Sequence, residues 1–194
     1  MKVNEIFYSI QGEGFHTGTA AVFIRLSGCN LKCPFCDTDF SKYEEKTEQQ
    51  IVDIILAIGG DSQLVVITGG EPTLQNCTML IDMLHRHGKI VAMESNGTRE
   101  VPYNIDWLTI SPKQQFVGKA GFLEVRRCNE LKVVYDGTND PELFSVNADH
   151  YYIQPCDKGF IKENQEIRNK CVEYIKEHPK WKLSLQTQKI LKVR

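Results

Sequence analysis

Short apolar runs, many of them rich in β-branched residues, recur along the chain, and each is followed by a polar or glycine-rich turn. Runs of about four to eight such residues, bounded by turn residues, are typical of β-strands. The pattern predicts strands at 20–27, 64–67, 89–93, 107–110, 130–136, 150–153 and 181–185. The turns after these strands hold most of the unusual residues of the chain.

Three segments between the predicted strands carry helix signals. Thr47 and Gln50 have the spacing of a capping box, in which two side chains satisfy the first free amide groups of a helix. Residues 74–86 form a second helical segment and residues 162–177 a third. The apolar face of the third consists of Ile167, Cys171, Tyr174 and Ile175.

Alternation of strands and helices predicts an α/β fold with a parallel sheet. A full eight-unit β/α barrel takes ~250 residues, whereas this chain has 194. We therefore expect a partial, open (β/α)6-type TIM-like barrel, formed by a single domain over residues 1–194. The gaps at 94–106 and 111–129 are too short or irregular for ordinary helices, so the helices should be trimmed there.

Composition and charge restrict the partners and the cellular compartment that we expect for this protein. The net charge is −2 and no dense Lys/Arg patch is present, so we expect no nucleic-acid partner. No stretch approaches the ~18 apolar residues of a membrane span, and the N-terminal run lacks the apolar core of a signal peptide. Seven cysteines, three of them in one loop, do not suit a disulfide framework. These features predict a protein of a reducing compartment, the cytoplasm, without membrane partners.

Three cysteines share the loop CNLKCPFC, with C-x3-C-x2-C spacing: Cys29, Cys33 and Cys36. A [4Fe–4S] cluster usually has four thiolate ligands, so three thiolates leave one iron open for a substrate or cosubstrate. A structural zinc site would need a fourth Cys or His at matching spacing, and none follows. Three unrelated core cysteines are the other alternative. The spacing favours a cluster without a fourth protein ligand.

Four further motifs lie at the ends of predicted strands. They are TGGEP at 68–72, ESNGT at 94–98, SPK at 111–113 and QPCD at 154–157. Glycine lets a backbone approach a ligand closely, and either Glu71 or exposed carbonyl groups can accept the ammonium group of a bound amino acid. Each motif alone is also typical of a turn. On one rim of a barrel, however, they can bind a ribose and an adenine.

Two single residues stand out. Arg25 lies within an apolar strand and shares a face with Phe23. An arginine inside a barrel is costly unless paired, and its planar fork suits a carboxylate; an outward, salt-bridged arginine is the alternative. Thr38 lies between Asp37 and Asp39, whose charge can attract a hard cation such as Mg²⁺. A hydroxyl that caps a turn is the alternative for Thr38.

The cysteine spacing together with TGGEP resembles the radical S-adenosylmethionine (SAM) superfamily, in which SAM occupies the fourth iron. With the other motifs, essentially the whole chain resembles the 7-carboxy-7-deazaguanine synthase family of the 7-deazapurine (queuosine precursor) pathway. The segments that carry this resemblance are 6–40, 68–72, 94–98, 111–113, 154–157 and 184–189.

The resemblance implies a role for each group of residues. The cluster ligands are Cys29, Cys33 and Cys36. The SAM contacts are Phe35, Cys36, Asp37, Gly70, Ser111, Pro112, Lys113, Gln154, Pro155, Cys156 and Asp157. The substrate, 6-carboxy-5,6,7,8-tetrahydropterin, is bound by Ile10, Gln11, Gly12, Arg25 and Thr68. The Mg²⁺ ligand is Thr38.

The resemblance also implies a lyase reaction. A 5′-deoxyadenosyl radical starts a ring contraction that ends in loss of ammonia, so the cofactors, and no catalytic side chain, carry the chemistry. A flavodoxin or ferredoxin as electron donor and a homodimer are further expectations. Two positions depart from the family: Cys156 stands where Gln is expected, and Gln188 where many relatives have His. The side-chain roles of these two residues stay open.

Two other functions compete with this one. A small radical SAM activase that installs a glycyl radical in a partner protein shares the cysteine loop and the GGE element. Such an activase would need an open face for a protein segment and no pterin site at Arg25 and Thr38. A non-enzymatic iron–sulfur carrier would have no use for TGGEP, SPK and QPCD on one rim.

Overall fold

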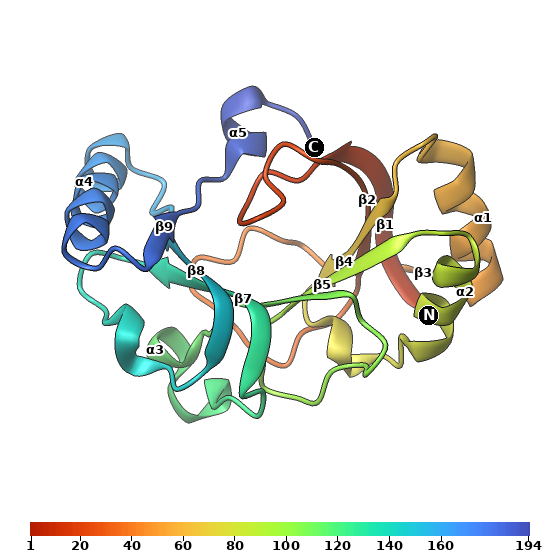
Figure 1. Cartoon of the computed structure of the whole chain (residues 1–194), viewed down its shortest axis with the longest axis horizontal. Coiled ribbons are helices and arrows are strands. Elements are labelled where there is room, and N and C mark those ends of the chain that lie inside the picture. The colour runs from red at the N-terminus through yellow and green to blue at the C-terminus, as the bar shows by residue number, and fades with distance from the viewer.

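The computed structural model describes residues 1–194 and contains one sheet of nine strands, in the order β3-β1-β2-β4-β5-β6-β7-β8-β9. Strands β2 and β4 to β9 run parallel, whereas β1 and β3 are antiparallel to their neighbours. The sheet curves around a central space without closing (Figure 1). The strands are β1 (Lys2–Ile10), β2 (Ala20–Leu26), β3 (Glu44–Glu45), β4 (Leu64–Gly69), β5 (Ile90–Ser95), β6 (Trp107–Ile110), β7 (Arg127–Tyr135), β8 (Asn147–Pro155) and β9 (Trp181–Leu183).

This architecture confirms the predicted partial, open barrel. All seven predicted strands are present, and the connection between β5 and β6 has no helix. The connection between β6 and β7 has only α3 (Gln114–Val117) and a 3-10 turn, Gly118–Gly121. The helices are therefore trimmed in the two gaps where the sequence predicts it.

Strand β1 was not predicted. It pairs with β2 along most of its length, with Glu5 opposite Arg25 and Phe7 opposite Phe23. Its sequence, KVNEIFYSI, mixes polar and apolar residues on both faces. Only the two-residue strand β3 lies beyond β1, so β1 is less covered than a central strand. A strand near the edge of a sheet therefore lacks the continuous apolar run that reveals a central parallel strand.

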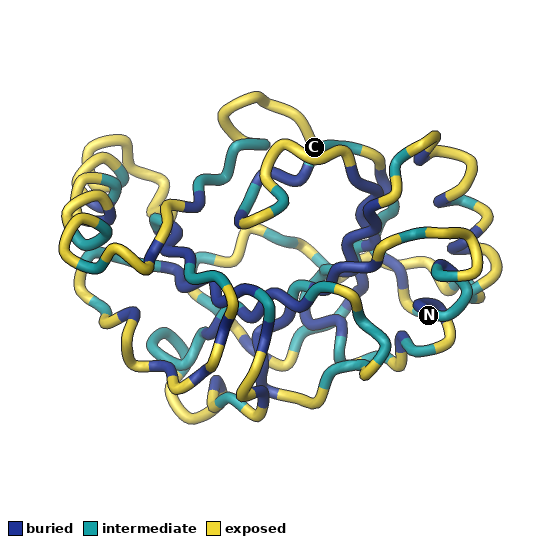
Figure 2. Tube along the Cα trace, viewed as in Figure 1, coloured by how far each residue is buried: buried dark blue, intermediate teal, exposed yellow.

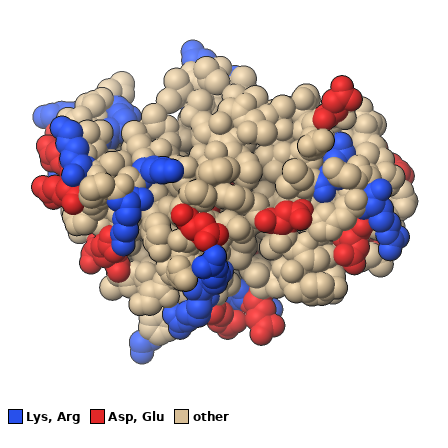
Figure 3. Space-filling model, viewed as in Figure 1, with Lys and Arg blue, Asp and Glu red and all other residues tan.

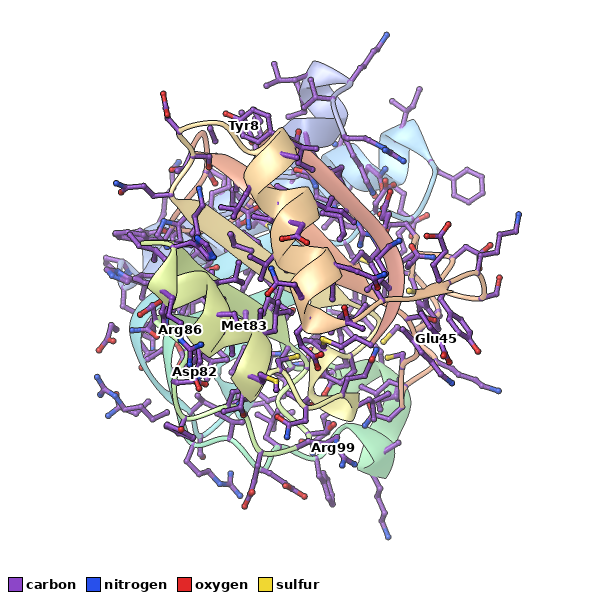
Figure 4. All side chains as sticks on the ribbon, turned by 90° about the vertical axis from the view of Figure 1, so that its right-hand side faces the viewer. Tyr8, Glu45, Asp82, Met83, Arg86 and Arg99 are labelled. Atoms are coloured by element: carbon purple, nitrogen blue, oxygen red, sulfur yellow. The ribbon has the colours of Figure 1, made fainter.

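Helices cover the outer face of the sheet. The long ones are α1 (Glu48–Ile58), α2 (Thr78–Arg86) and α4 (Ile161–Glu177), and α5 (Thr187–Leu191) lies near the end of the chain. Thr47 and Gln50 form the predicted capping box of α1. Figure 4 looks onto α1 and α2, which lie side by side, with Arg86 at the C-terminal end of α2.

Helix α2 begins later than predicted. The 74–86 pattern includes Gln75 and Asn76, which are engaged outside the helix. The Gln75 side chain accepts from the Lys2 amide and donates to the Lys2 and Ser27 carbonyls, so it ties this turn to β1. The Asn76 side chain accepts from the amide of Thr78. The helix can begin only after these two residues.

Two apolar clusters lie on opposite faces of the sheet. The larger, with 28 buried residues, lies between the sheet and the helices and includes Val22, Ile24 and Leu26 of β2. The smaller has 6 buried residues, includes Ala21 and Phe23, and faces the centre of the barrel. Successive side chains of β2 therefore contribute alternately to the two clusters. Figure 2 shows that buried residues concentrate along the strands.

Candidate active site

A cavity of about 500 Å³ lies inside the open barrel, toward the C-terminal ends of the parallel strands. Of the residues predicted for the cluster, SAM, the substrate and Mg²⁺, only the buried Pro112 does not line it. Segments far apart in the sequence therefore meet as predicted. Their individual roles stay predictions.

The three predicted cluster cysteines carry free thiols and line this cavity. Burial raises the pKa of the Cys33 thiol, and the nearby Lys113 ammonium group opposes this shift. No group of three His, Cys, Asp or Glu side chains is close enough together to hold a single metal ion. A [4Fe–4S] cluster does not need such convergence, because each thiolate binds a different iron. The cysteine set therefore fits a cluster better than a mononuclear zinc ion.

The TGGEP turn packs directly on the cysteine loop. The amide of Glu71 donates to the carbonyl of Gly28 (2.8 Å), and that of Gly70 donates to the carbonyl of Leu26 (3.1 Å). A Cβ atom on Gly70 would collide with the Gly28 carbonyl and with Cys29. The glycine is thus required for contact between the two loops, and it also leaves Gly70 on the cavity wall.

Glu71 itself is not free to bind an ammonium group. Its side chain is fully buried and does not line the cavity. One carboxylate oxygen accepts from the amide and hydroxyl of Thr73 and from the hydroxyl of Ser95, and the other accepts from the amide of Asn96. Glu71 therefore joins the TGGEP and ESNGT turns, and of the two candidates for the ammonium group only exposed carbonyls remain.

The SPK and QPCD turns form the opposite wall. The Lys113 ammonium group donates to the carbonyl and hydroxyl of Ser111 (2.7 and 2.6 Å), and burial lowers its pKa to about 8. Gln154 is buried and its side-chain oxygen Oε1 accepts from the hydroxyl of Ser184. Cys156 has a buried thiol whose pKa is raised by burial. Lys113 thus places a cation beside the cysteine loop.

Inward-facing residues change from apolar to polar toward the C-terminal ends of the strands. On β2, Phe23 is followed by Arg25, and on β4, Val66 is followed by Thr68. On β5 the polar residue is Glu94, which accepts from the Thr68 hydroxyl (3.1 Å) and from the side-chain amide of Gln11 (3.0 Å). The cavity floor is therefore apolar and its walls are polar.

The shortest ion pair in this region, between Lys132 of β7 and Glu13, was not predicted. The Lys132 ammonium group is 2.6 Å from Glu13 and 3.5 Å from Glu94. Burial alone would raise the pKa of Glu13, but Lys132 and hydrogen bonds from two glutamines outweigh it and hold the pKa at about 2. A sequence signal did exist, because Glu130 and Lys132 interrupt an apolar strand with the spacing of one face.

The end of the chain covers the gap between β9 and β1. We call residues 184–194 the C-terminal segment. The amide of Thr187 donates to the Gly12 carbonyl (3.1 Å), and the Gln186 and Gln188 side chains both donate to Glu13. Lys189 pairs with Asp37 of the cysteine loop (2.7 Å) and with Asp157 (3.5 Å). The segment thus connects the first strand, the cysteine loop and the QPCD turn.

Arg25 lines the cavity, as predicted, but it has an internal partner. Its Nε atom is 2.8 Å from Glu5 of β1, and its side chain is 25% exposed. The sequence left two alternatives for Arg25, an arginine that faces the inside of the barrel and one that faces outward in a salt bridge. The structure combines the two, because the salt bridge lies on the cavity side of the β1–β2 pair.

Thr38 also lines the cavity, between two aspartates with other partners. Asp37 pairs with Lys189, and Asp39 accepts from the Ser41 amide, which together with the Ser41 hydroxyl lowers the pKa of Asp39. The two carboxylates are therefore less available to a cation than the sequence indicates, and the Thr38 hydroxyl remains.

The fold and the cysteine-lined cavity define a radical SAM enzyme. Residues 23–112 match the radical SAM superfamily. The structure aligns with the crystal structure of QueE from Escherichia coli with a TM-score of 0.76 and 26% identity, covering 96% of this chain and 93% of that one.

Two relatives identify the family. The 7-carboxy-7-deazaguanine synthase of Bacteroides thetaiotaomicron is 46% identical, over 100% of this chain and 98% of its own. That of Bradyrhizobium diazoefficiens is 39% identical, over 99% of this chain and 98% of its own. The chain belongs to the 7-carboxy-7-deazaguanine synthase family.

The surface and helices add two observations. No helix in the structure has both the length and the apolar character needed to cross a membrane. On the face in Figure 3, acidic and basic side chains are interspersed, and neither sign forms a continuous patch.

Proposed function

We propose that this protein is a lyase that converts 6-carboxy-5,6,7,8-tetrahydropterin to 7-carboxy-7-deazaguanine with loss of ammonia, in queuosine or other 7-deazapurine biosynthesis. The observation that carries this proposal is one cavity shared by Cys29, Cys33 and Cys36 and by Arg25. When bound, the [4Fe–4S] cluster and SAM supply the hydrogen abstraction that starts the reaction. The protein side chains bind and orient the substrate.

The cavity walls suit a carboxylated pterin. Arg25 offers a guanidinium group to the substrate carboxylate, and its terminal nitrogens make no hydrogen bond within the protein. A pterin also carries ring and amino N–H groups, which donate to a carboxylate, and Glu94 presents one to the cavity. The Lys132 ammonium group lies 3.5 Å from this carboxylate. The substrate carboxylate and the pterin ring therefore have separate partners.

Thr38 is the residue we assign to Mg²⁺. A magnesium ion keeps several waters and takes few protein ligands, which suits a single hydroxyl with substrate and water oxygens at the other positions. The two neighbouring aspartates have partners of their own, so they contribute charge rather than direct ligation.

The competing activase function is less well supported. An activase would bind a protein segment through an open side of the barrel. The C-terminal segment covers the gap between β9 and β1 with contacts to Gly12, Glu13 and Asp37.

We further propose that residues 1–194 act as one radical SAM domain in the cytoplasm, as a homodimer, with a flavodoxin or ferredoxin as electron donor.

The test is anaerobic reconstitution of the cluster, followed by an assay with SAM, Mg²⁺, a reductant and the carboxylated tetrahydropterin. We expect formation of 7-carboxy-7-deazaguanine and ammonia, with SAM not consumed. Binding of SAM without any turnover of this pterin would refute the proposed substrate and favour the activase. Absence of SAM binding would favour the iron–sulfur carrier.

A further inference from the structure

Ser184 is a buried residue that joins two segments of the cavity wall. It directly follows β9, is 2% exposed and does not itself line the cavity. Its amide donates to the carbonyl of Ile153 in β8 (2.9 Å), which fixes its position beside that strand. Its hydroxyl accepts from the amide of Gly14 (3.0 Å) and donates to the side-chain oxygen of Gln154 (2.9 Å). One hydroxyl group therefore connects the loop after β1 to the C-terminal end of β8.

The Gly14 end of this bridge belongs to the loop that carries the substrate residues 10–12. Gly14 has a φ of 66°, and a Cβ atom at this position would collide with the carboxylate of Glu130. The same carboxylate accepts from the amide of Phe15 (2.8 Å). The loop is thus held by Glu130 on one side and by Ser184 on the other. The Ser184 hydroxyl therefore helps to fix the position of the substrate residues that precede Gly14.

The Gln154 end of the bridge belongs to the SAM side of the cavity. Gln154 lines the cavity and is one of the SAM contacts that the family resemblance implies. A hydroxyl group has one proton to donate, and Ser184 donates it to Oε1 of Gln154. The Nε2 group of Gln154 makes no hydrogen bond within the protein, so it remains free to donate to a ligand. Ser184 therefore sets the orientation of this amide group.

We propose that Ser184 is a positioning residue that couples binding of the pterin to binding of SAM. This inference rests on the proposed function. Each ligand restrains one end of the same hydrogen-bonded bridge, so the ligand that binds second loses less conformational entropy in ordering it. Coupling between two sites is reciprocal, so the pterin and SAM should strengthen each other's binding by the same factor.

The test measures this coupling factor in the wild type and in Ser184→Ala. The reconstituted enzyme is titrated anaerobically with SAM, with and without saturating 6-carboxy-5,6,7,8-tetrahydropterin, and then with the pterin, with and without SAM. Mg²⁺ is present and the reductant is omitted, so that SAM is not cleaved. The alanine variant loses both hydrogen bonds of the hydroxyl, and its coupling factor should fall by about threefold to tenfold. Ser184→Cys keeps the size of the side chain with a weaker donor and should lie between the two.

Ser62→Ala is the matched control. The Ser62 hydroxyl donates to the carbonyl of Ala20 (2.8 Å) at the N-terminal end of β2, away from the cavity. This variant also loses a hydrogen bond, but its coupling factor should equal that of the wild type.

A purely structural role of Ser184 would weaken both ligands and leave the coupling factor unchanged. That result, or a wild type in which the two ligands bind independently, would overturn the inference while the proposed function stands. Failure of the wild type to bind the carboxylated pterin at all would instead refute the proposed function, and this inference with it.

Discussion

The two halves of the cavity are built in different ways. The half that carries the cysteine loop depends on backbone, because the Gly70 and Glu71 amides join the TGGEP turn to the end of β2 and to the loop itself. The half along β1, β2, β5 and β7 depends on charged side chains, with Arg25 paired to Glu5 and Lys132 to Glu13. Local motifs determine the first half, and pairs between distant segments determine the second.

This difference has a consequence for substitutions. Changes in the cysteine-loop half should remove a cofactor and leave the fold intact, since its thiols lie on a loop after β2. Changes in the charged half should affect both stability and substrate binding, because each partner there also neutralises another buried or half-buried charge. The following variants test this separation.

The largest effect is expected for Cys33→Ala. Loss of one of three thiolates should abolish the brown chromophore and all SAM cleavage, while the unfolding free energy of the apoprotein stays near that of the wild type. Absorption spectra, iron content and SAM cleavage measure these effects. Cys171→Ala is the control, because Cys171 is buried in α4 away from the cavity, and this variant should keep its cluster. Full activity of Cys33→Ala would show that the cysteine set is wrong.

The second largest effect is expected for Lys132→Met. Lys132 is 4% exposed and is 2.6 Å from Glu13, so its removal leaves a largely buried carboxylate without its counter-charge. Removal of one partner of a buried ion pair typically costs about 3–5 kcal/mol, and urea denaturation should show a loss of this size. The double variant Glu13→Gln/Lys132→Met should recover part of it. A loss below about 1 kcal/mol would place this pair among ordinary surface salt bridges.

Acid should weaken the same pair. The folded pKa of Glu13 is about 2 against an ordinary value of 4.5. A depressed pKa stabilises the fold above the unfolded value, and this contribution, about 3 kcal/mol, is lost as the pH falls from about 4.5 toward 2. Urea denaturation of the wild type and of Glu13→Gln measures it. The difference in unfolding free energy between the two proteins should shrink over this range, and a constant difference would contradict the assignment.

The sequence predicted the cysteine-loop half well, because spacing and turn motifs are local. The capping box of α1 and the motifs after β2, β4, β6 and β8 are legible in short stretches of chain. The charged half was predicted only in part: Arg25, Thr68 and residues 10–12 were expected to bind the substrate, and Glu94 stood in the ESNGT motif, but the ion pairs were not predicted. Glu13 and Lys132 are 119 positions apart, and nothing local indicates that a glycine-rich loop and a strand supply opposite charges to one cavity. Glu5 was missed together with β1, since an edge-side strand lacks a clear apolar pattern.

A smaller effect on ligand binding is expected for Arg25→Ala. Truncation of one partner of a charged, largely buried contact costs about 2–3 kcal/mol, close to a hundredfold in the dissociation constant. Binding of the carboxylated pterin should weaken by this amount, whereas SAM binding should stay within about twofold. Arg25→Lys should recover only part of the loss, because an ammonium group cannot reproduce the planar fork. Anaerobic titrations measure both ligands, and equal losses for both would reopen the activase function.

The smallest effect is expected for Thr38→Ala. The cluster and SAM depend on other groups, so iron content and uncoupled SAM cleavage should be unchanged. Loss of one hydroxyl ligand should lower turnover by about tenfold at limiting Mg²⁺, which corresponds to about 1.4 kcal/mol, and a higher Mg²⁺ concentration should restore part of it. Thr38→Ser keeps the hydroxyl and is the matched control. Unchanged activity of Thr38→Ala with unchanged Mg²⁺ dependence would show that the cation lies elsewhere, and Asp39, beside Thr38 on the cavity wall, would then be the next residue to test.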